Sequence, residues 1–188
     1  LNLSEGSLKE ARNFLEKEVG KNYALAAPRR FKTKTKGAQE AHEAIRPTDP
    51  WLTPESIKGN LDRRQFRLYD LIWRRFMATQ MPPAIFDATS VDITAKNYTF
   101  RATGQIMKFD GFLKIYPVKF AEITLPNLEP KEKLELLEIT PNQHFTQPLA
   151  RFSEASLVKT LEKHGIGRPS TYAPIISTIQ ERNYVQKD

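Results

Sequence analysis

The feature that most constrains the fold of this 188-residue chain is a change of apolar periodicity at Pro82-Pro83. Before it, LDRRQFRLYDLIWRRFMATQM (residues 61–81) has apolar residues at helical spacing, with arginines mostly on the other face. After it, AIFDATSVDITA (residues 84–95) alternates as a strand does. Proline ends a helix because it lacks the backbone N–H donor. The sequence therefore predicts a mixed α and β, multidomain chain that changes from helices to strands near residue 83.

Residues 1–82 are predicted to form a helical domain. A first helix is expected from Ser7, with Glu10 completing a capping box. Its apolar positions recur at helical spacing at Leu8, Ala11, Leu15 and Val19. In the long helix, Trp73 and Phe76 could stack on nucleic-acid bases, but their amphipathic context favours the core. The other expected core positions of that helix are Phe66, Tyr69, Ile72 and Met77.

Three shorter features connect these two helices. Residues 20–38 read as a basic, irregular loop. A short helix is expected over Ala41–Ile45, ending before Pro47, because the residue before a proline disfavours helix. Thr53 and Pro54 are the residue types favoured at the cap and the first position of another helix.

Residues 83–147 are predicted to be β-rich, and residues 148–188 helical. Residues 98–118 read as two strands joined by a hairpin at Asp110-Gly111, and residues 133–140 as a further strand. In the last segment, one helix should begin at a Ser153 cap and end at Gly165. A second should follow within four residues, which gives a helix–turn–helix arrangement.

Charge and composition narrow the classes of partner and of chemistry. The net charge is +7, and the positive excess lies towards the two ends of the chain. Such a balance favours a polyanionic partner such as nucleic acid, although many basic proteins bind none. The absence of cysteine excludes disulfides, thiolate nucleophiles and cysteine-ligated zinc. No apolar run approaches the roughly 18 residues of a membrane span, and no membrane partner is expected.

The motif AHEAIRPT (residues 41–48) begins like the zinc-protease signature H-E-x-x-H. Its fifth position is Arg46, which has no lone pair for a metal, so no zinc site is expected. On one helical turn, His42 and Arg46 would share a face. An imidazole beside a fixed cation suits contact with a phosphate and proton transfer near it. The competing interpretation is a surface histidine without a role.

A second motif, HGIGRPST (residues 164–171), combines a glycine-containing turn with the start of a helix. Ser170 and Thr171 would place hydroxyl and N–H groups at the helix N-terminus, and Arg168 adds a charge just before it. Donors, helix dipole and cation would then converge on an anion. Plain helix capping accounts for Ser170 and Thr171, but less well for Arg168 and the two glycines.

Other charged residues give weaker signals. Arg182 lies about three turns after the second motif, where a solvated last-turn cation is the simple alternative to a binding role. The acidic residues Asp87, Asp92 and Asp110 form no paired D-x-D, so neither magnesium nor any other metal is expected to bind this chain.

Together, AHEAIRPT and ARFSEASLVKTLEKHGIGRPSTYAPIISTIQERNYV resemble bacterial DNA topoisomerase I, a type IA topoisomerase. The second motif matches over some 35 residues. RLYDLIWRRFMATQM, the QMPPA stretch and TPNQHFTQPLARF are similar to the family as well, so the resemblance covers nearly the whole chain.

The resemblance implies an isomerase that relaxes negatively supercoiled DNA without ATP. In the family, a tyrosine cleaves single-stranded DNA and forms a 5′-phosphotyrosyl link; another strand passes through and the break is resealed. That tyrosine sits in a motif like Y-x-R-T-D-S, and none of the six tyrosines here has this context. The Mg²⁺-binding Toprim domain is not in this sequence either. The chain is therefore expected to be an internal fragment that does not cleave DNA alone.

The resemblance also implies an architecture and roles for single residues. Residues 1–82 match part of the nucleophile-carrying helical domain, 83–147 the β-rich arch or hinge of the toroid, and 148–188 the start of a DNA-gripping domain. His42 matches a histidine near the scissile phosphate. The positions that match DNA-backbone contacts are Arg168, Ser170, Thr171 and Arg182, and Ile166 and Gly167 would approach the backbone through the turn. Arg46 is predicted to bind DNA because it would lie beside His42.

Two alternatives remain from the sequence. One is a stand-alone helix–turn–helix DNA-binding module, although PSTYAPIISTIQE offers few side chains for base edges. The other is the corresponding fragment of a reverse gyrase, which resembles H-E-x-I-R-P-T but needs a helicase half. The expected partner is single-stranded or negatively supercoiled DNA. The parent enzyme is expected to be monomeric and cytoplasmic, associated with the bacterial nucleoid.

Overall fold

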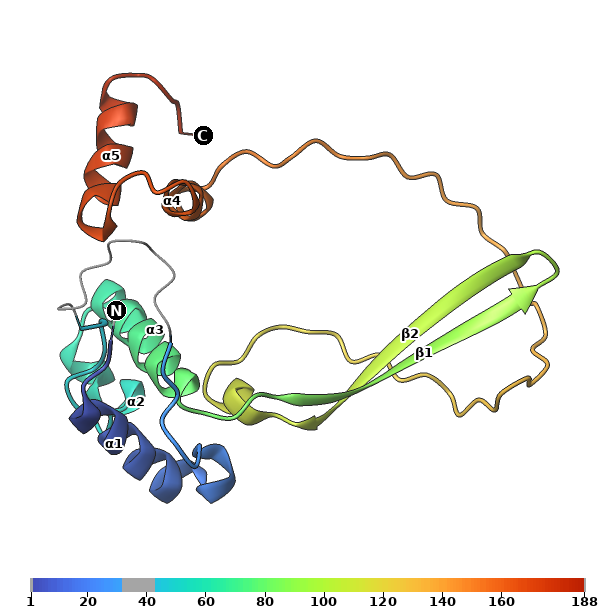
Figure 1. Cartoon of the computed structure of the whole chain (residues 1–188), viewed down its shortest axis with the longest axis horizontal. Coiled ribbons are helices and arrows are strands. Elements are labelled where there is room, and N and C mark those ends of the chain that lie inside the picture. Colours follow the sequence, from blue (N-terminus) through green and yellow to red (C-terminus); the bar gives the residue numbers. More distant parts are fainter. Residues whose placement is uncertain (1, 32–42, 188) are drawn as a thin grey trace. The chain divides into compact units, whose positions relative to one another are not determined.

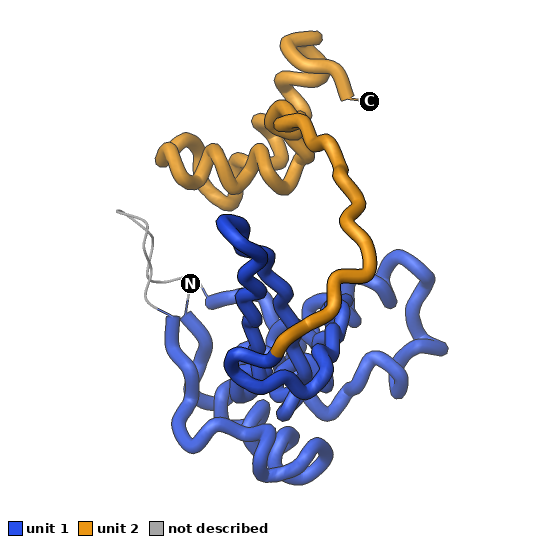
Figure 2. Tube along the Cα trace, turned by 90° about the vertical axis from the view of Figure 1, so that its right-hand side faces the viewer, with its two compact units in different colours: residues 1–132 blue, residues 133–188 orange. Residues whose placement is uncertain are grey.

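The computed structural model describes residues 2–31 and 43–187. The chain divides into two compact units, Leu1–Glu132 and Lys133–Asp188 (Figure 2). Unit 1 contains the first helices and a long β-hairpin, and unit 2 contains the last two helices (Figure 1). The predicted mixed α and β fold class is confirmed. The predicted division into three domains at residues 82 and 147 stays a prediction.

The first helix begins three residues earlier than the sequence predicts. Helix α1 spans Glu5–Phe14, and its N-cap is Ser4, whose hydroxyl accepts from the Ser7 N–H at 3.3 Å. The predicted cap at Ser7 is therefore wrong. A π-helical turn, Leu15–Val19, continues α1. A 3-10 turn, Lys21–Tyr23, follows it.

The segment after residue 42 is not helical, which corrects the predicted helix over its described part. Glu43 forms an isolated parallel bridge with Asn2, and residues 44–46 have no regular structure. The Ala44 N–H donates to the Asn2 carbonyl oxygen at 2.8 Å, so this donor is used between segments instead of within a helix. His42 and Ala41 lie outside the described residues.

Two further helices complete the helical part of unit 1. Helix α2, Pro54–Ile57, has Thr53 as its cap and proline at its first position, as predicted, and continues into a 3-10 turn, Lys58–Asn60. Helix α3, Arg63–Thr79, begins with a capping box between Asp62 and Gln65. It ends three residues before Pro82.

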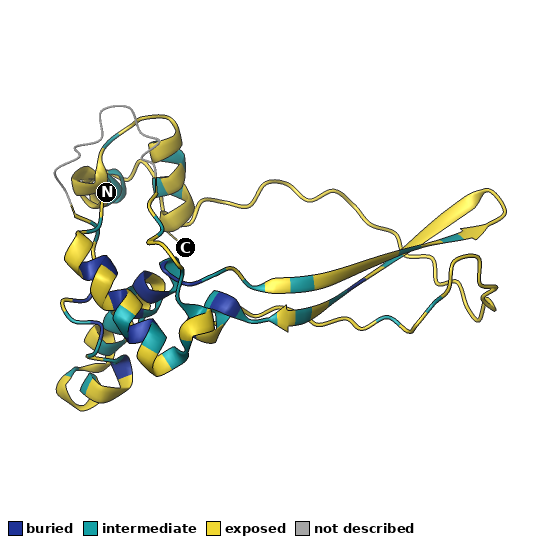
Figure 3. Cartoon of the chain, turned by 60° about the horizontal axis from the view of Figure 1, so that its bottom comes forward, coloured by how far each residue is buried: buried dark blue, intermediate teal, exposed yellow. Residues whose placement is uncertain are grey.

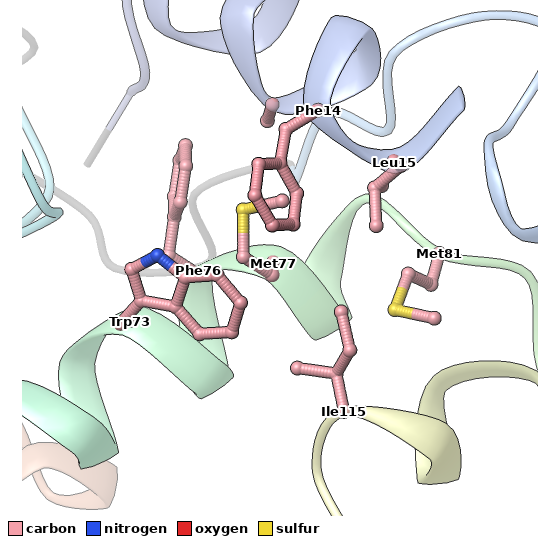
Figure 4. Packing of buried hydrophobic residues seen from close by; sticks show 8 residues of the cluster. Phe14, Leu15, Trp73, Phe76, Met77, Met81 and Ile115 are labelled. Carbon is pink, nitrogen blue, oxygen red and sulfur yellow. The ribbon is translucent and has the colours of Figure 1, made fainter. Parts of the chain in front are cut away.

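The hydrophobic core lies between α1, its π-helical extension and α3, with one residue from beyond the hairpin (Figure 4). Phe14 packs edge-on against Trp73 at 5.5 Å between ring centroids. The Trp73 indole N–H donates to the Pro50 carbonyl oxygen at 2.9 Å, so its burial leaves no polar atom unpaired. The cluster is Ala11, Phe14, Leu15, Trp73, Phe76, Met77, Met81 and Ile115. Trp73 and Phe76 are thus core residues, as their helical context predicts.

The β-hairpin pairs β1, Ile85–Ala95, with β2, Tyr98–Phe109, in antiparallel register. Its turn is at Lys96-Asn97, where Lys96 has φ 55°. The predicted hairpin at Asp110-Gly111 is wrong, because residues 98–109 form one continuous strand. Asp110 instead precedes a 3-10 turn, Gly111–Lys114, and accepts from the Tyr23 hydroxyl at 2.7 Å.

A later segment crosses the hairpin at Gly104, the one fully buried position of its two strands. A Cβ at Gly104 would lie 2.6 Å from the Ile123 carbonyl oxygen and 2.8 Å from Leu125 Cγ. Next to it, Gln105 and Ile123 exchange two backbone hydrogen bonds of 2.9 and 3.3 Å. The close approach is possible because residue 104 has no side chain.

Unit 2 begins with a long irregular segment. Residues 133–140, predicted as a strand, pair with no other segment among the described residues, and Leu137 is 89% exposed. Helix α4, Glu154–Lys163, starts at the predicted Ser153 cap, and α5, Pro169–Glu181, follows. None of the described residues of unit 2 is fully buried (Figure 3). None of the helices in the described chain is both long and apolar enough to cross a membrane.

Candidate nucleic-acid interface

The turn between α4 and α5 is built by backbone hydrogen bonds. The Gly165 N–H donates to the Glu162 carbonyl oxygen at 3.0 Å, and the Ile166 N–H to that of Leu161 at 2.9 Å. This pair of bonds is the Schellman arrangement, which ends a helix on a residue with positive φ. Gly165 has φ 70°, so the predicted end of α4 is confirmed. The turn leaves the Ile166 side chain 54% exposed.

The start of α5 uses the backbone and hydroxyl groups of its first residues. Thr171 Oγ1 accepts from the Arg168 N–H at 2.8 Å and donates to the Arg168 carbonyl oxygen at 3.1 Å. The Thr171 hydroxyl is therefore already engaged in capping. Ser170 is exposed, and among the described residues neither its N–H nor its hydroxyl has a recorded partner. Of the two hydroxyls proposed from sequence, Ser170 is the one available to a ligand.

Gly167 brings the turn against the first two turns of α5. Its φ is 76°, and an added Cβ would lie 3.1 Å from Ile175 Cδ1 and 3.2 Å from both Thr171 Oγ1 and Tyr172 Cε1. A residue with a side chain would meet both a strained backbone and occupied space. Gly167 therefore sets the path by which Arg168 enters the helix.

Arg168 supplies the charge of this turn. The residue is exposed, and its Nη1 donates to the Gly167 carbonyl oxygen at 2.7 Å. No ion pair of Arg168 is recorded within residues 2–31 and 43–187. Its other N–H groups, the Ser170 donors and the positive end of the α5 dipole lie at one end of a 13-residue helix. This arrangement can bind a phosphate.

Arg182 is not part of the same cluster. It is the C-cap of α5, and its N–H donates to the Thr178 carbonyl oxygen at 3.0 Å. With a rise of 1.5 Å per residue, about 20 Å of helix separate it from Arg168. The two arginines could therefore contact different phosphates of one strand, but not the same one.

In the first motif, the structure joins Arg46 to Glu43. Arg46 Nε donates to Glu43 Oε1 at 2.7 Å and its Nη2 to Oε2 at 3.3 Å, while Nη1 donates to the Pro47 carbonyl oxygen at 3.1 Å. Glu43 Oε1 also accepts from the Ser4 N–H at 2.9 Å. These bonds, with that from Arg46 first, lower the pKa of Glu43 from 4.5 to about 2. The arginine predicted to contact phosphate is thus held by a carboxylate. The position of His42 beside it lies outside the described residues.

Sequence reasoning missed the role of Glu43. It joins the motif to the start of the chain, and Arg46 lines a cavity of about 260 Å³ against the first turn of α1. The signal was present in the spacing, since Glu43 and Arg46 stand three residues apart. The likeness to the zinc-protease signature H-E-x-x-H indicated His42 instead.

Comparisons with known proteins agree with this geometry. The family model for DNA topoisomerase matches residues 2–188. The DNA topoisomerase 1 of Haemophilus influenzae is 50% identical over 190 residues, covering 100% of this chain and 22% of that protein. The Pseudomonas aeruginosa DNA topoisomerase 1 is 51% identical over 187 residues, covering 98% of this chain and 21% of that protein. The chain belongs to the bacterial DNA topoisomerase I family.

A solved structure supports the same family at the level of the fold. Full-length topoisomerase I from Thermotoga maritima matches with a TM-score of 0.78 and 34% identity, over 99% of this chain and 30% of that one. The family resemblance of the two motifs is confirmed. The chain spans about a fifth of the length of the curated topoisomerases named above.

The environments of two tyrosines bear on which group in a topoisomerase chain could act as nucleophile. The Tyr23 hydroxyl donates to Asp110, which raises its pKa, and burial adds to the rise. Burial and nearby Asp49 raise the pKa of Tyr69, whose hydroxyl donates to the Leu52 carbonyl oxygen at 2.6 Å. A nucleophile that is activated by a lowered pKa would show the opposite shift, and neither tyrosine does.

Proposed function

We propose that this chain is the part of a type IA DNA topoisomerase that grips one DNA strand while that strand is cut and resealed. The parent enzyme would relax negatively supercoiled DNA without ATP, through a 5′-phosphotyrosyl intermediate and strand passage. The observation that carries the proposal is the turn Gly165–Thr171, where exposed Arg168 and free Ser170 donors meet a helix N-terminus in a chain of this family.

The residues of the turn would bind backbone phosphate without reading bases. Arg168 would hold one phosphate through its guanidinium group, with Ser170 as a second donor and Gly167 allowing close approach. Arg182 would contact a phosphate further along the strand. Phosphate contacts position a strand but carry no sequence information. Such a grip suits an enzyme that acts at many sequences.

His42 is proposed to assist proton transfer near the scissile phosphate, as the family resemblance implies. Its imidazole titrates near neutral pH and can exchange a proton there. Arg46, held by Glu43, would then serve less as a phosphate ligand than as a fixed positive charge near the motif. The attacking tyrosine would come from outside the six tyrosines of this sequence.

The Mg²⁺ expected for the parent enzyme does not fit the residues that the structure describes. No group of three or more His, Asp or Glu side chains among the described residues could hold a metal ion. Asp92 is paired with Arg101, Asp87 with Lys108, and Asp110 with Tyr23. The ion is therefore proposed to bind the Toprim domain. The parent enzyme is proposed to act as a monomer in the cytoplasm.

Binding of a single-stranded oligonucleotide to the chain tests the grip. Arg168→Ala should weaken binding and reduce the slope of log affinity against log salt by about 0.7, the value for one phosphate contact on a single strand. Arg151→Ala removes an equal charge from the irregular segment of unit 2 and should leave the slope unchanged. Equal slopes for Arg168→Ala and wild type would contradict the contact. Sequence-specific preference for duplex would favour the helix–turn–helix regulator instead.

Catalysis can be tested by exchanging the matching region of the Haemophilus influenzae DNA topoisomerase 1 for this chain. The hybrid should relax negatively supercoiled plasmid, and the chain alone should not. His42→Ala in the hybrid should slow relaxation by about 100-fold, the lower range for a group that transfers a proton. Relaxation at the unsubstituted rate would show that the role given to His42 is wrong.

A further inference from the structure

The outer face of α3 carries a stripe of exposed arginines that the proposed grip does not use. Arg63, Arg64, Arg67 and Arg75 are all exposed. At 100° per residue, Arg64 and Arg75 fall opposite Trp73, Phe76 and Met77, while Arg67 and then Arg63 lie towards one edge of that outer side. We call these four residues the α3 arginine stripe. Between them lie the side chains of Leu68 and Leu71, which are 59% and 47% exposed.

The stripe differs from most other arginines of unit 1 in its lack of carboxylate partners; Arg29 alone shares this lack among the described residues. Arg74, on the same helix, pairs with Asp70 and Glu55. Ion pairs are also recorded for Arg12, Arg30, Arg46 and Arg101. Within the described part of the chain, no such pair is recorded for the four stripe arginines. Most of the unpaired guanidinium charge of unit 1 is thus gathered on one helix.

The position of two of these arginines works against the helix that carries them. Arg63 and Arg64 occupy the first turn of α3, where the helix dipole disfavours cations, and no acidic residue lies in that turn. Asp62 precedes it, but its Oδ1 accepts from the N–H groups of Arg64 and Gln65 at 2.7 and 2.9 Å. These two cations therefore do not stabilise the start of the helix, and an external anion is the partner they fit.

We infer that the α3 arginine stripe is a second DNA-binding surface, one that takes the sugar-phosphate backbone of duplex DNA. From Arg63 to Arg75 the helix rises about 18 Å, close to five base pairs of duplex at 3.4 Å each. The inference rests on the proposed function only for the identity of the polyanion.

The chemistry of the stripe favours duplex over a single strand. Surfaces that take the bases of a single strand usually stack them on aromatic rings. The stripe has none, because the rings of Phe66, Tyr69 and Trp73 lie on the inner side of α3. Leu68 and Leu71 carry no hydrogen-bonding groups to read base edges. Guanidinium groups held on the exposed side of one helix can instead contact the regularly spaced phosphates of a duplex.

A charge-matched pair of variants tests the inference on the chain itself. The first combines Arg63→Gln, Arg64→Gln and Arg67→Gln; the control combines Arg12→Gln, Arg30→Gln and Arg101→Gln. Both lose three positive charges from unit 1. Binding of a 20-base-pair duplex and of a single-stranded oligonucleotide would be followed by fluorescence anisotropy over a salt series, after thermal unfolding shows that both variants fold.

For duplex, the stripe variant should lose up to about 2.7 from the slope of log affinity against log salt, or about 0.9 per phosphate contact, while the control keeps its slope. Single-strand binding should change little in either variant. An unchanged duplex slope, an equal loss in the control, an equal loss for single strands, or tighter binding of polyglutamate than of duplex would each overturn the inference. Arg168→Ala separates the two proposals, because it should weaken single-strand binding and spare duplex binding.

Discussion

The helices of unit 1 and those of unit 2 begin with similar sequence signals, but they are held in different ways. Helices α1 and α3 enclose a cluster of eight buried apolar residues. In α4 and α5 no described side chain is fully buried, and an open groove lined by residues of both helices, such as Val158 and Ile176, remains on their surface. Caps and the bonds of the Gly165–Thr171 turn fix the local geometry of unit 2.

This difference shows which interactions fix the orientation of the charged groups in each unit. In unit 1, side-chain packing sets the orientation of α3 and hence the direction of its outer face. In unit 2, the direction of Arg168 depends on bonds within about ten residues of backbone. A single backbone change can therefore damage the grip, whereas the α3 arginine stripe should be sensitive to the core.

Truncation of a core side chain in unit 1 should give the largest effect on stability and is the strongest test of the difference between the two units. Met77 is completely buried, and Met77→Ala should lower the free energy of unfolding by about 2–5 kcal/mol, since it leaves a cavity. Urea unfolding followed by tryptophan fluorescence measures it, because Trp51 and Trp73, the two tryptophans of the chain, are both in unit 1. Leu157→Ala, in α4, should leave this transition unmoved. Equal shifts would break the distinction between the units.

A side chain at Gly167 should have the next largest effect, confined to unit 2. Gly167→Ala meets a left-handed backbone, which costs about 1–2 kcal/mol, and contacts with Ile175 and Thr171. Gly165→Ala shares the positive φ but meets nothing within 4 Å, so it is the matched control. Gly167→Ala should cause the greater loss of amide-exchange protection at the start of α5 and of single-strand affinity. Greater damage from Gly165→Ala would contradict the packing argument.

The Glu43–Arg46 pair should give the smallest effect, visible mainly as a pH dependence. The pKa of Glu43 is lowered from 4.5 to about 2, so the folded state favours the carboxylate. Its contribution to stability should be complete above about pH 4.5 and lost as pH falls towards 2. Because the side chain is 40% exposed, solvent screens the pair and the effect is small.

Thermal unfolding of Glu43→Gln at two pH values measures this contribution. The melting temperature should fall below that of the unsubstituted chain at pH 6, and the difference should shrink towards pH 3. Glu18→Gln, at an exposed position without a recorded ion pair among the described residues, is the control and should show no such trend. A difference in melting temperature that grows towards low pH would contradict a lowered pKa of Glu43 in the folded state.

Features encoded in neighbouring residues could be predicted from the sequence. The apolar spacing of α3 placed Trp73, Phe76 and Met77 in the core, and residue type alone identified the caps Thr53 and Ser153. The Gly165 turn was also predictable, because few other residues tolerate its backbone conformation. The motif at residues 164–171 is local in the same way, so its elements could be placed before the structure was known.

Features that depend on distant segments were predicted wrongly. Ser4 and Ser7 are both suitable caps. The structure uses Ser4, whose N–H also donates to Glu43, 39 residues away. The Asp110-Gly111 signal was outweighed because cross-strand pairing continues along β2 to Phe109. The segment at residues 133–140 has strand-like residues but no partner strand. In each case the outcome depends on a distant segment, or on the lack of one to pair with, which the local spacing of apolar residues does not reveal.

The crossing at Gly104 has a consequence for how sequence change is tolerated along the hairpin. Most positions of β1 and β2 face solvent on at least one side and can accept larger residues. At Gly104 the smallest possible addition, a methyl group, would collide with the backbone of residue 123. The two backbone hydrogen bonds between Ile123 and Gln105 would be disrupted, and the hairpin would lose its contact with the segment around residue 123. Gly104 therefore cannot be replaced by a larger residue, although most other positions of the hairpin can. The limit comes from the space available and not from a chemical role of the residue.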